Sequence, residues 1–495
     1  MNYWVKGVPT EVLHNKQFID GSWVSDDGDR FVRDSPAHGV PVSTIQIGRS
    51  DHVENAITAA RSSFEKGAWS KVPAADRAEL LRKAASKIAD RREELAYWET
   101  LETGKPYQQS LNEVDGSVEL WNYAAGQAQT IHGETFDNFG DGSLGFVLRE
   151  PVGVVGLITP WNFPLFILSE RLPFILASGN SVVVKPSEFT STTTITMAEI
   201  LNDLGMPNGV LNVVTGFGDP VGSTLLEHED VDMVSFTGST RVGQIAMKAA
   251  AKNIKKLSLE LGGKNPVVVL PDADLDKAAD GIVYGICFNA GQCCVSGSRL
   301  IVHESIKDAL IEKIVALLKN VRVGDPFEPG VHMGPIVNSQ QMNRILDLIA
   351  SGSNQGGKLV HGGNRTGSEL GHFVEPTVFC NVEEDMWIAK EEIFGPVLSV
   401  FTFESEDEAI HLANATEFGL SATVWTQGLD TGFKFMRKIK AGRVWVNTTI
   451  TGGPEMPIGG YKQSGLGRET GLVGAIEYTE TKSAIVDLGD RKSWV

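Results

Sequence analysis

The sequence predicts an α/β protein built from two sheets of mostly parallel strands. Short uncharged runs rich in valine and isoleucine alternate with helical periods over residues 152–251, and a second alternation begins after Gly262. Buried parallel strands have this continuous apolar character, and repeated strand–turn–helix units produce doubly wound folds. A chain of 495 residues is too long for one hydrophobic core, so the two alternations indicate separate domains.

Two other segments flank the first alternation. Apolar residues at helical spacing over residues 51–105 predict two helices, the second of which ends at Gly104. Residues 131–150 interleave glycines with phenylalanines and predict a β-hairpin. The tail, Tyr478–Leu488, has the pattern of an edge strand.

The elements of both alternations follow from their apolar periods. In the first, we expect strands at Val152–Ile158, Ser181–Val184, Val210–Val214 and Met233–Phe236, and helices at Pro164–Ala177, Thr193–Leu204 and Val242–Ala251. In the second, we expect strands at Pro266–Leu270, Arg299–Val302, Val397–Phe401, Ala422–Trp425 and Val444–Val446, and helices at Leu275–Ala290, Ile306–Lys319 and Glu406–Ala413.

Composition excludes several functional classes. A net charge of −18 argues against nucleic-acid partners and anionic membrane surfaces. Four cysteines are too few for a disulfide scaffold, and the chain has neither a Cys-x-x-Cys nor a His-Glu-x-x-His motif, so no metal is expected. No apolar run reaches the ~18 residues of a membrane span, and residues 1–10 lack a signal-peptide core. We therefore expect a cytoplasmic protein.

Cys293 and Cys294 form a doublet flanked by small and polar residues. A thiol attacks well only as thiolate, and a polar turn rich in amides can stabilise that charge. The alternative is that both are small core residues, since free cysteine is usually buried and inert.

Glycine turns after predicted strands suggest a nucleotide site. The turn from Gly238 to Gly243 opens a helix directly after a buried strand, where free N–H groups attract an anion. The alternative is that Ser239 only caps that helix. The stretch Gly216–Gly222 has one residue too many for a dinucleotide fingerprint, and residues 352–358 have P-loop spacing without the Ser/Thr, so we expect a surface loop there.

Four polar residues are further candidates for the site. Lys185 and Glu188 would lie at the carboxyl edge of the sheet, where nucleotides bind, although such a pair is often merely solvated. Glu260 lies between leucines, where a raised pKa would suit a general base; the alternative is a carboxylate at a helix end. Asn162 lies at a turn between strand and helix, where asparagine is common.

The segment Phe288-Asn289-x-Gly291-Gln292-x-Cys294-x-x-Gly297-Ser298-Arg299 resembles the cysteine signature of the aldehyde dehydrogenase superfamily. The resemblance runs from about residue 15 to the end and rests on at least six motifs in the family's order. It implies a Rossmann-like cofactor domain, an α/β catalytic domain and a small β oligomerisation arm. It also implies Cys294 as nucleophile, Glu260 as general base, and Asn162 with the backbone N–H of Cys294 as oxyanion hole.

The resemblance further implies NAD-dependent oxidation of an aldehyde to its acid through a cysteine thiohemiacetal and a thioester that is hydrolysed. A carboxylate at Glu188 would bind ribose hydroxyls and repel a 2′-phosphate, which favours NAD over NADP. The implied cofactor residues are Ile158, Trp161, Lys185, Glu188, Gly218, Ser239, Gly243, Leu261, Gln341, Arg344, Glu392 and Phe394. Acyl transfer to coenzyme A, or a non-catalytic relative, are the alternatives; the presence of Glu260 and Cys294 argues against them.

Substrate residues are less well determined. Phe163 and Phe288 would line the aldehyde tunnel, and Ile458 stands where an aromatic residue often lies. Glu170 and Arg171 depart from the aromatic–lysine pair of many relatives, and Arg171 could pair with Glu469 as a proton relay. The stretch 454–465 is similar to that of bacterial betaine aldehyde dehydrogenases, which leaves betaine aldehyde, an aminoaldehyde or a plain aliphatic aldehyde open. Glu170 in the tunnel would favour a cation, whereas a contact with Arg171 or the backbone would not.

Domain boundaries complete the expectation. We expect an NAD-binding domain at 1–130 and 151–262, a catalytic domain at 263–477, and an oligomerisation arm at 131–150 and 478–495. Because an exposed apolar hairpin and an edge strand both need covering, we expect a homodimer or homotetramer.

Overall fold

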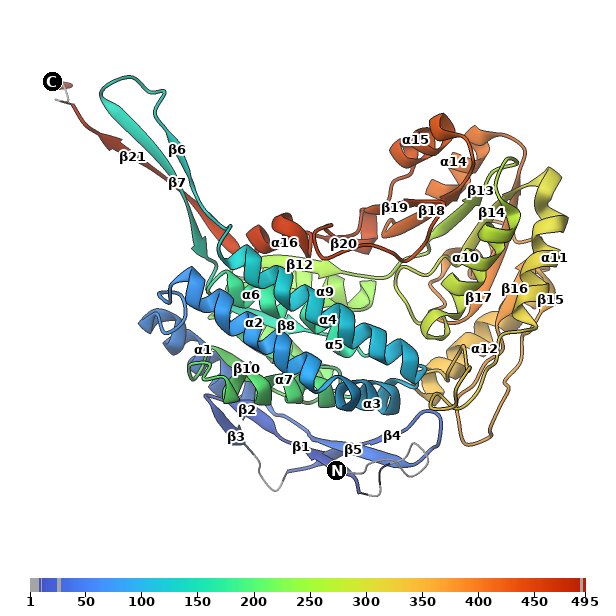
Figure 1. Ribbon diagram of the computed structural model, residues 1–495, viewed down its shortest axis with the longest axis horizontal. Coiled ribbons are helices and arrows are strands. Elements are labelled where there is room, and N and C mark those ends of the chain that lie inside the picture. The colour runs from blue at the N-terminus through green and yellow to red at the C-terminus, as the bar shows by residue number, and fades with distance from the viewer. Residues whose placement is uncertain (1–8, 10, 25–27, 490–492) are drawn as a thin grey trace.

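The computed structural model describes residues 9, 11–24, 28–489 and 493–495, and two large sheets dominate it (Figure 1). The first has eight strands in the order β20-β12-β11-β8-β9-β10-β2-β3. Its parallel strands are β8 (Val154–Ile158), β9 (Ser181–Lys185), β10 (Leu211–Val213), β11 (Met233–Thr237) and β12 (Lys256–Glu260). β2 (Gln17–Ile19), β3 (Ser22–Val24) and β20 (Gly465–Leu466) are antiparallel additions at the two edges.

Helices cover both faces of this sheet, because successive residues of each strand enter different cores. Val155 and Leu157 pack with one cluster, whereas Val154 and Ile158 pack with the other. The covering helices are α1 (Ser50–Lys66), α2 (Ala74–Asp90), α3 (Arg92–Thr103), α4 (Tyr107–Ala128), α5 (Pro164–Ser169), α6 (Leu172–Ala177), α7 (Thr192–Asp203), α8 (Ser223–Glu227) and α9 (Thr240–Ala250). The predicted doubly wound arrangement is confirmed.

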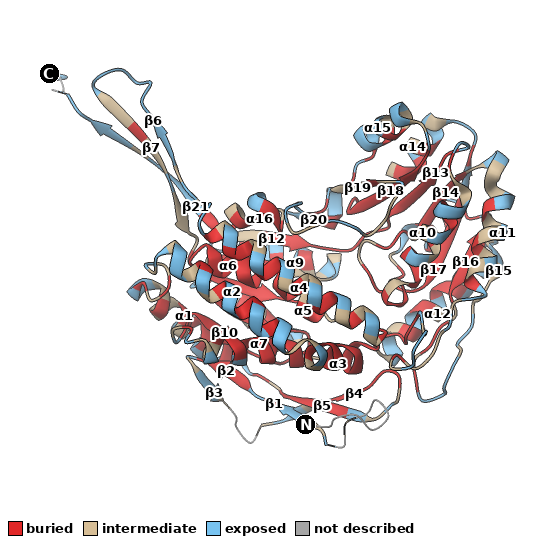
Figure 2. Cartoon of the chain, viewed as in Figure 1, coloured by how far each residue is buried: buried red, intermediate tan, exposed pale blue. Residues whose placement is uncertain are grey.

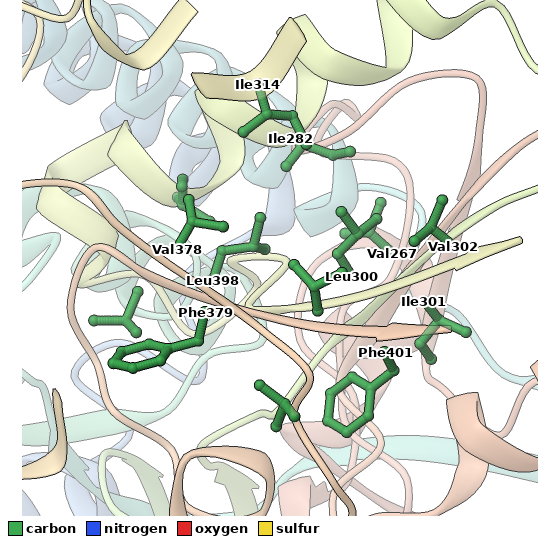
Figure 3. Packing of buried hydrophobic residues seen from close by; sticks show 14 of the residues in the cluster. Val267, Ile282, Leu300, Ile301, Val302, Ile314, Val378, Phe379, Leu398 and Phe401 are labelled. Atoms are coloured by element: carbon green, nitrogen blue, oxygen red, sulfur yellow. The ribbon is translucent and has the colours of Figure 1, made fainter. Parts of the chain in front are cut away.

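The second sheet has seven strands in the order β15-β16-β17-β14-β13-β18-β19, and all its pairs are parallel except β15 with β16. Figure 3 shows its buried side chains, including Val267, Leu300 and Phe379. The strands are β13 (Pro266–Val269), β14 (Arg299–His303), β15 (Lys358–His361), β16 (Thr377–Cys380), β17 (Val397–Phe403), β18 (Ser421–Trp425) and β19 (Arg443–Val446). The helices are α10 (Leu275–Cys287), α11 (Lys307–Leu318), α12 (Ser339–Asn354), α13 (Trp387–Lys390), α14 (Glu406–Asn414) and α15 (Leu429–Lys438).

A three-stranded arm projects from the body and carries the C-terminus near its tip (Figure 1). β7 (Ser143–Pro151) lies between β6 (Glu134–Phe136) and β21 (Thr479–Asp487), so the predicted hairpin and tail strand meet in one sheet. Most of the arm is exposed (Figure 2). A second small sheet joins β1 (Leu13–Asn15), β5 (Pro41–Gln46) and β4 (Arg30–Asp34), and α16 (Gly471–Glu477) precedes β21.

Three helix predictions need correction. Residues 51–105 form three helices, because Arg91 leaves helical geometry between α2 and α3. The helix expected at Pro164–Ala177 breaks at Arg171, which has φ −127°, and α6 then starts at Leu172 with Pro173 in its first turn. The helix expected to reach Ala290 ends at Cys287, because Asn289 and Ala290 adopt positive φ angles of 48° and 53°.

Two more expectations differ from the structure. The surface loop expected at residues 352–358 is partly helix: Gly352 is buried near the end of α12, where a Cβ atom would lie 2.8 Å from Ile388 Cδ1. Glu260 ends a buried strand that the sequence analysis did not identify, and so is not at a helix end.

Some expectations stay predictions. Residues 1–8 and 490–492 lie outside the described part, and the domain boundaries are not tested. No helix of the described ranges is long and apolar enough to cross a membrane.

Candidate active site

The candidate site lies where the strand order of the first sheet reverses. β8 and β11 are neighbours, while β9 and β12 lie on their outer sides, which makes this a topological switch point. The carboxyl ends of the strands meet there, since Ile158 pairs with Lys185 and Thr237 pairs with Glu260. Ligands of open α/β sheets bind at such an edge.

Two cavities, of about 610 Å³ and 190 Å³, adjoin this edge and share one set of wall residues. The shared residues are Ile167, Thr237, Glu260, Leu261 and Cys294. The larger cavity continues between α4 and α10, and the smaller one runs toward Ser239 and Glu392. We call them the tunnel and the nucleotide cavity.

The loop that carries Cys294 is held by Asn265. The Asn265 side-chain amide donates to the carbonyl oxygens of Cys294 at 2.7 Å and Ser296 at 2.9 Å. Gly263 allows this approach, because a Cβ there would lie 2.8 Å from the Cys294 oxygen. Cys293 is buried against Phe163 and Ile167, whereas Cys294 is half-buried between the cavities. The structure therefore gives the two cysteines different surroundings.

Contact with the Cys293 thiol and burial both raise the pKa of Cys294 well above its usual value. Burial raises the pKa of Glu260 to about 8, and one of its carboxyl oxygens, Oε1, has no hydrogen-bond partner among the described residues. A carboxyl in this environment is neutral below that pH and binds a proton readily above it. Glu260 thus has the electrostatic properties of a general base.

Asn162 is buried beside the cysteine loop and lines the nucleotide cavity. One of the N–H groups of its side chain donates to the carbonyl oxygen of Gln292 at 3.0 Å. A primary amide has two N–H groups, so this bond leaves a second donor in the side chain.

Glu170, Arg171 and Glu469 form a buried charge network. Arg171 Nη1 donates to Glu170 Oε2 at 2.9 Å, and Arg171 Nε lies 3.8 Å from Glu469 Oε1. Burial alone would lower the pKa of Arg171, but Glu469 and Glu170 reverse this and the net shift is upward. A guanidinium with a raised pKa holds its proton, so it orients carboxylates better than it passes protons. The relay stays a prediction.

Glu170 meets both descriptions that the sequence analysis left open. It lines the tunnel together with Phe163, Phe288 and Ile458, and it is paired with Arg171. Burial raises the pKa of its carboxyl, and the charge of Arg171 opposes that shift.

Aromatic rings form much of the tunnel wall. Phe163 and Phe288 stack with centroids 5.6 Å apart, and Tyr284 lies 5.3 Å from Phe288. Tyr284 and Phe166 also line the tunnel and were not predicted from the sequence. Tyr284 precedes Phe288 by four residues in the predicted helix, and that spacing was the available signal.

The nucleotide cavity gathers seven predicted cofactor residues. Trp161 and Phe394 meet edge to face at 5.3 Å, and Glu392 Oε1 accepts from the Gly263 N–H at 2.9 Å. Gly262 is required here, because a Cβ would lie 2.1 Å from Glu392 Oε2. The seven residues are Trp161, Ser239, Leu261, Gln341, Arg344, Glu392 and Phe394.

The other five predicted cofactor residues are not on this cavity's wall. Ile158 and Lys185 end neighbouring strands, and Lys185 Nζ lies 3.6 Å from Glu188 Oε2. Gly243 packs α9 against Leu261, where a Cβ would come within 2.6 Å of the leucine side chain. Gly218 is exposed at the start of the turn 218–222. Ile158 and Lys185 end β8 and β9, so with Glu188 they continue the same sheet edge beyond the ends of β11 and β12 that line the cavity.

Ser239 caps α9, since its hydroxyl accepts from the Val242 N–H at 3.4 Å, and it also lines the cavity. The capping alternative and the functional one are therefore compatible. A strand edge, a helix N-terminus and a carboxylate beside a buried lysine together suit a dinucleotide. No cluster of three or more metal-binding side chains occurs in the described ranges.

The model of the aldehyde dehydrogenase family matches residues 23–484. The chain belongs to the aldehyde dehydrogenase family. It is 50% identical to an NAD-dependent aldehyde dehydrogenase from Sinorhizobium meliloti, with a TM-score of 0.96 over 97% of this chain and 96% of that one. A betaine aldehyde dehydrogenase from Staphylococcus aureus in complex with NAD+ is 38% identical, with a TM-score of 0.95 over 97% and 96%.

A relative outside this pair is the mitochondrial benzaldehyde dehydrogenase of Antirrhinum majus. It is 41% identical over 483 residues, which are 97% of this chain and 90% of that protein. The family resemblance of the sequence is thereby confirmed over nearly the full chain. The substrates named for these relatives differ, so family membership leaves the substrate of this enzyme open.

Proposed function

We propose that this enzyme oxidises an aldehyde to the acid with NAD, using Cys294 as nucleophile and Glu260 as the base for hydrolysis. The observation that carries the proposal is the position of both residues on the shared wall of the two cavities. An aldehyde that enters through the tunnel would reach the thiol from one side. A cofactor in the nucleotide cavity would face it from the other.

The chemistry follows from the residues in order. Cys294 loses its thiol proton to solvent, and the thiolate sulfur bonds to the carbonyl carbon to give a thiohemiacetal. The second amide N–H of Asn162 and the backbone N–H of Cys294 stabilise the oxyanion. Loss of hydride leaves a thioester. Glu260 then removes a proton from a water molecule, whose oxygen attacks the thioester carbonyl. The acid departs and the thiol is restored.

NAD supplies the hydride acceptor when it is bound. Glu392, Phe394 and Trp161 would hold the nicotinamide end, with Gln341 and Arg344 beside them. Ser239 at the start of α9 would bind the pyrophosphate. Lys185 and Glu188 would hold the adenosine ribose, and Glu188 would disfavour a 2′-phosphate. This choice of NAD agrees with the cofactor bound in the structural relatives.

We further propose an aldehyde with a cationic amine or ammonium group as substrate. Support comes from the Glu170 carboxylate on the tunnel wall and from the rings of Tyr284 and Phe288, which line the same tunnel. The ion pair with Arg171 offsets part of the Glu170 charge, so the expected preference is modest. Besides Glu260, the tunnel is lined by the carboxylates of Glu113, Glu170 and Asp280, and Glu113 is paired with Lys105.

We propose a homodimer or a homotetramer assembled through the arm. β21 is the outer strand of the sheet β21-β7-β6, and Ile485 on it is 73% exposed. An unpaired edge with apolar side chains favours pairing with a second copy.

An assay of NADH formation tests the central proposal. The purified enzyme is given a panel of aldehydes of equal length, with and without coenzyme A. Acid and NADH in equal amounts, independent of coenzyme A, are expected. Acyl-coenzyme A as product, or no NADH with any aldehyde, would contradict the proposal.

A further inference from the structure

A buried lysine outside both cavities holds the segment that carries the oxyanion donor. Lys105 follows Gly104 at the end of α3, and its side chain has no exposed surface. Its ammonium donates to the backbone carbonyl oxygen of Asn162 at 2.9 Å. The same ammonium lies 4.4 Å from the ring centroid of Phe163. One charged group therefore contacts two consecutive residues of the site.

Lys105 is itself fixed by two carboxylates from different helices. Glu113 of α4 accepts a hydrogen bond from it at 2.5 Å, and Glu99 Oε2 of α3 lies 3.7 Å away. Charge-assisted bonds of this kind are short and strong, and a buried ion pair keeps its geometry because water does not compete. The ammonium is thus held in place by α3 and α4, and through its own contacts it restrains the position of residues 162–163.

The Asn162 carbonyl has a second donor from the cysteine loop. The side-chain amide of Asn289 donates to it at 2.9 Å and to the Gln292 oxygen at 3.2 Å. With the Asn162 amide bound to that same Gln292 oxygen, the backbone and the side chain of Asn162 are both fixed relative to the loop that precedes Cys294. Lys105 is the charged member of this set.

We propose that Lys105 is a positioning residue for oxyanion stabilisation, acting through the backbone of Asn162. An oxyanion donor is effective only where it is already aimed at the position of the developing charge. Without the ammonium, the 162–163 segment loses its charged anchor and the Phe163 ring loses its cation contact. The side-chain amide of Asn162 would then lose its fixed orientation. Cys294 would stay in place, because Asn265 holds it separately.

The test compares Lys105→Met with Lys255→Met. Lys255 is a matched control, because it is also buried and donates to two backbone carbonyls, of Leu226 and His228, away from both cavities. The NADH burst in a single turnover should slow about 10- to 100-fold in Lys105→Met and stay within about threefold of wild type in Lys255→Met. Lys105→Gln is a second variant, used in case Lys105→Met folds poorly. Its NADH burst should also be slower than that of the wild type.

Two further readouts separate positioning from general stability. Alkylation of Cys294 by iodoacetamide develops no oxyanion, so its rate in Lys105→Met should stay within about threefold of wild type. In an Asn162→Ala background, which alone should cost about 10²–10³ in rate, the added Lys105→Met change should cost less than about threefold more. The proposal would be overturned if the losses from Asn162→Ala and Lys105→Met multiplied in the double variant, or if alkylation of Cys294 slowed as much as the burst. Equal effects of Lys105→Met and Lys255→Met on the burst would also overturn it.

This inference rests on the proposed role of Asn162, and the single variant tests that role separately. If Asn162→Ala keeps its full burst rate, the oxyanion assignment itself is wrong. If Asn162→Ala is slow and Lys105→Met is as fast as Lys255→Met, the oxyanion assignment stands and the positioning role fails.

Discussion

The side-chain amide of Asn162 donates to the carbonyl oxygen of Gln292 at 3.0 Å and joins loops that belong to different sheets. Asn162 follows β8 of the eight-stranded sheet, and Gln292 precedes β14 of the seven-stranded sheet. The loop that carries Cys294 is thus fixed relative to the sheet edge where the cofactor would bind. If Cys294 is the nucleophile, as proposed, the reaction geometry depends on this contact between loops of the two sheets.

Glu260→Gln should separate acylation from hydrolysis. The amide cannot remove a proton from water, so the thioester should accumulate after one hydride transfer. We expect a burst of about one NADH per site followed by turnover slowed about 10²–10⁴-fold, measured by stopped-flow absorbance. Steady-state turnover equal to wild type would show that another group is the base.

The rate of thioester hydrolysis should rise with pH. Burial raises the pKa of Glu260 to about 8, so its carboxylate form appears as pH increases through that value. The rate should be about half maximal near pH 8 and level off above it, because only the ionised form accepts the proton. The same profile in Glu260→Gln should lack this limb. A wild-type rate that is flat from pH 6.5 to 9.5 would contradict the assignment.

Much of the fold could be predicted because the parallel strands are short, apolar and bounded by turns. Val154–Ile158 and Val397–Phe403 follow this pattern closely. β12 was missed because polar residues alternate with its two leucines, so it lacks the continuous apolar run of the other parallel strands, and its burial depends on β11 and β20. The break of the helix at Arg171 was missed because a buried carboxylate from a distant segment, that of Glu469, lies beside that arginine.

In the candidate site, too, residues in local motifs could be predicted from the sequence, whereas contacts between distant residues could not. Cys294, Glu260 and Asn162 stand in local motifs, so the sequence alone was enough to place them in one site. The contacts of Lys105 with Glu113 and Asn162 join residues up to 57 positions apart, and no local pattern reports them. The ion pair of Glu170 was one of two open possibilities, because sequence does not fix the direction of a side chain.

Glu170→Gln should reduce a preference for cationic aldehydes. The comparison is betaine aldehyde or 4-aminobutanal against an uncharged aldehyde of equal length, scored as the ratio of kcat/KM values. A cation contact of about 0.5–2 kcal/mol corresponds to roughly a two- to thirtyfold change in that ratio. Asp280→Asn is the matched control, because Asp280 also lines the tunnel but is exposed.

Two results would contradict the role of Glu170 in substrate choice. One is a wild-type enzyme with no preference for the cation. The other is a preference that survives Glu170→Gln unchanged. In either case the Glu170 carboxylate serves only to hold Arg171. The substrate is then uncharged, or other residues select it.

A lysine on the exposed strand of the arm should weaken assembly. Ile485→Lys places a charge on β21, where we propose that two copies pair. Light scattering at micromolar concentration should give a dimer or tetramer for wild type and a smaller species for the variant. Leu370→Lys, at an exposed apolar residue outside the arm, is the control and should keep the wild-type mass. A monomeric wild-type enzyme would contradict the proposal outright.

The most direct test of the whole account is to locate the acyl group on the enzyme. Glu260→Gln is mixed with aldehyde and NAD, quenched in acid, digested and examined by mass spectrometry. One acyl group is expected, attached to Cys294, which disappears in Glu260→Gln/Cys294→Ala and persists in Glu260→Gln/Cys293→Ala. An acyl group on Cys293, or NADH formation without any acylated cysteine, would contradict it.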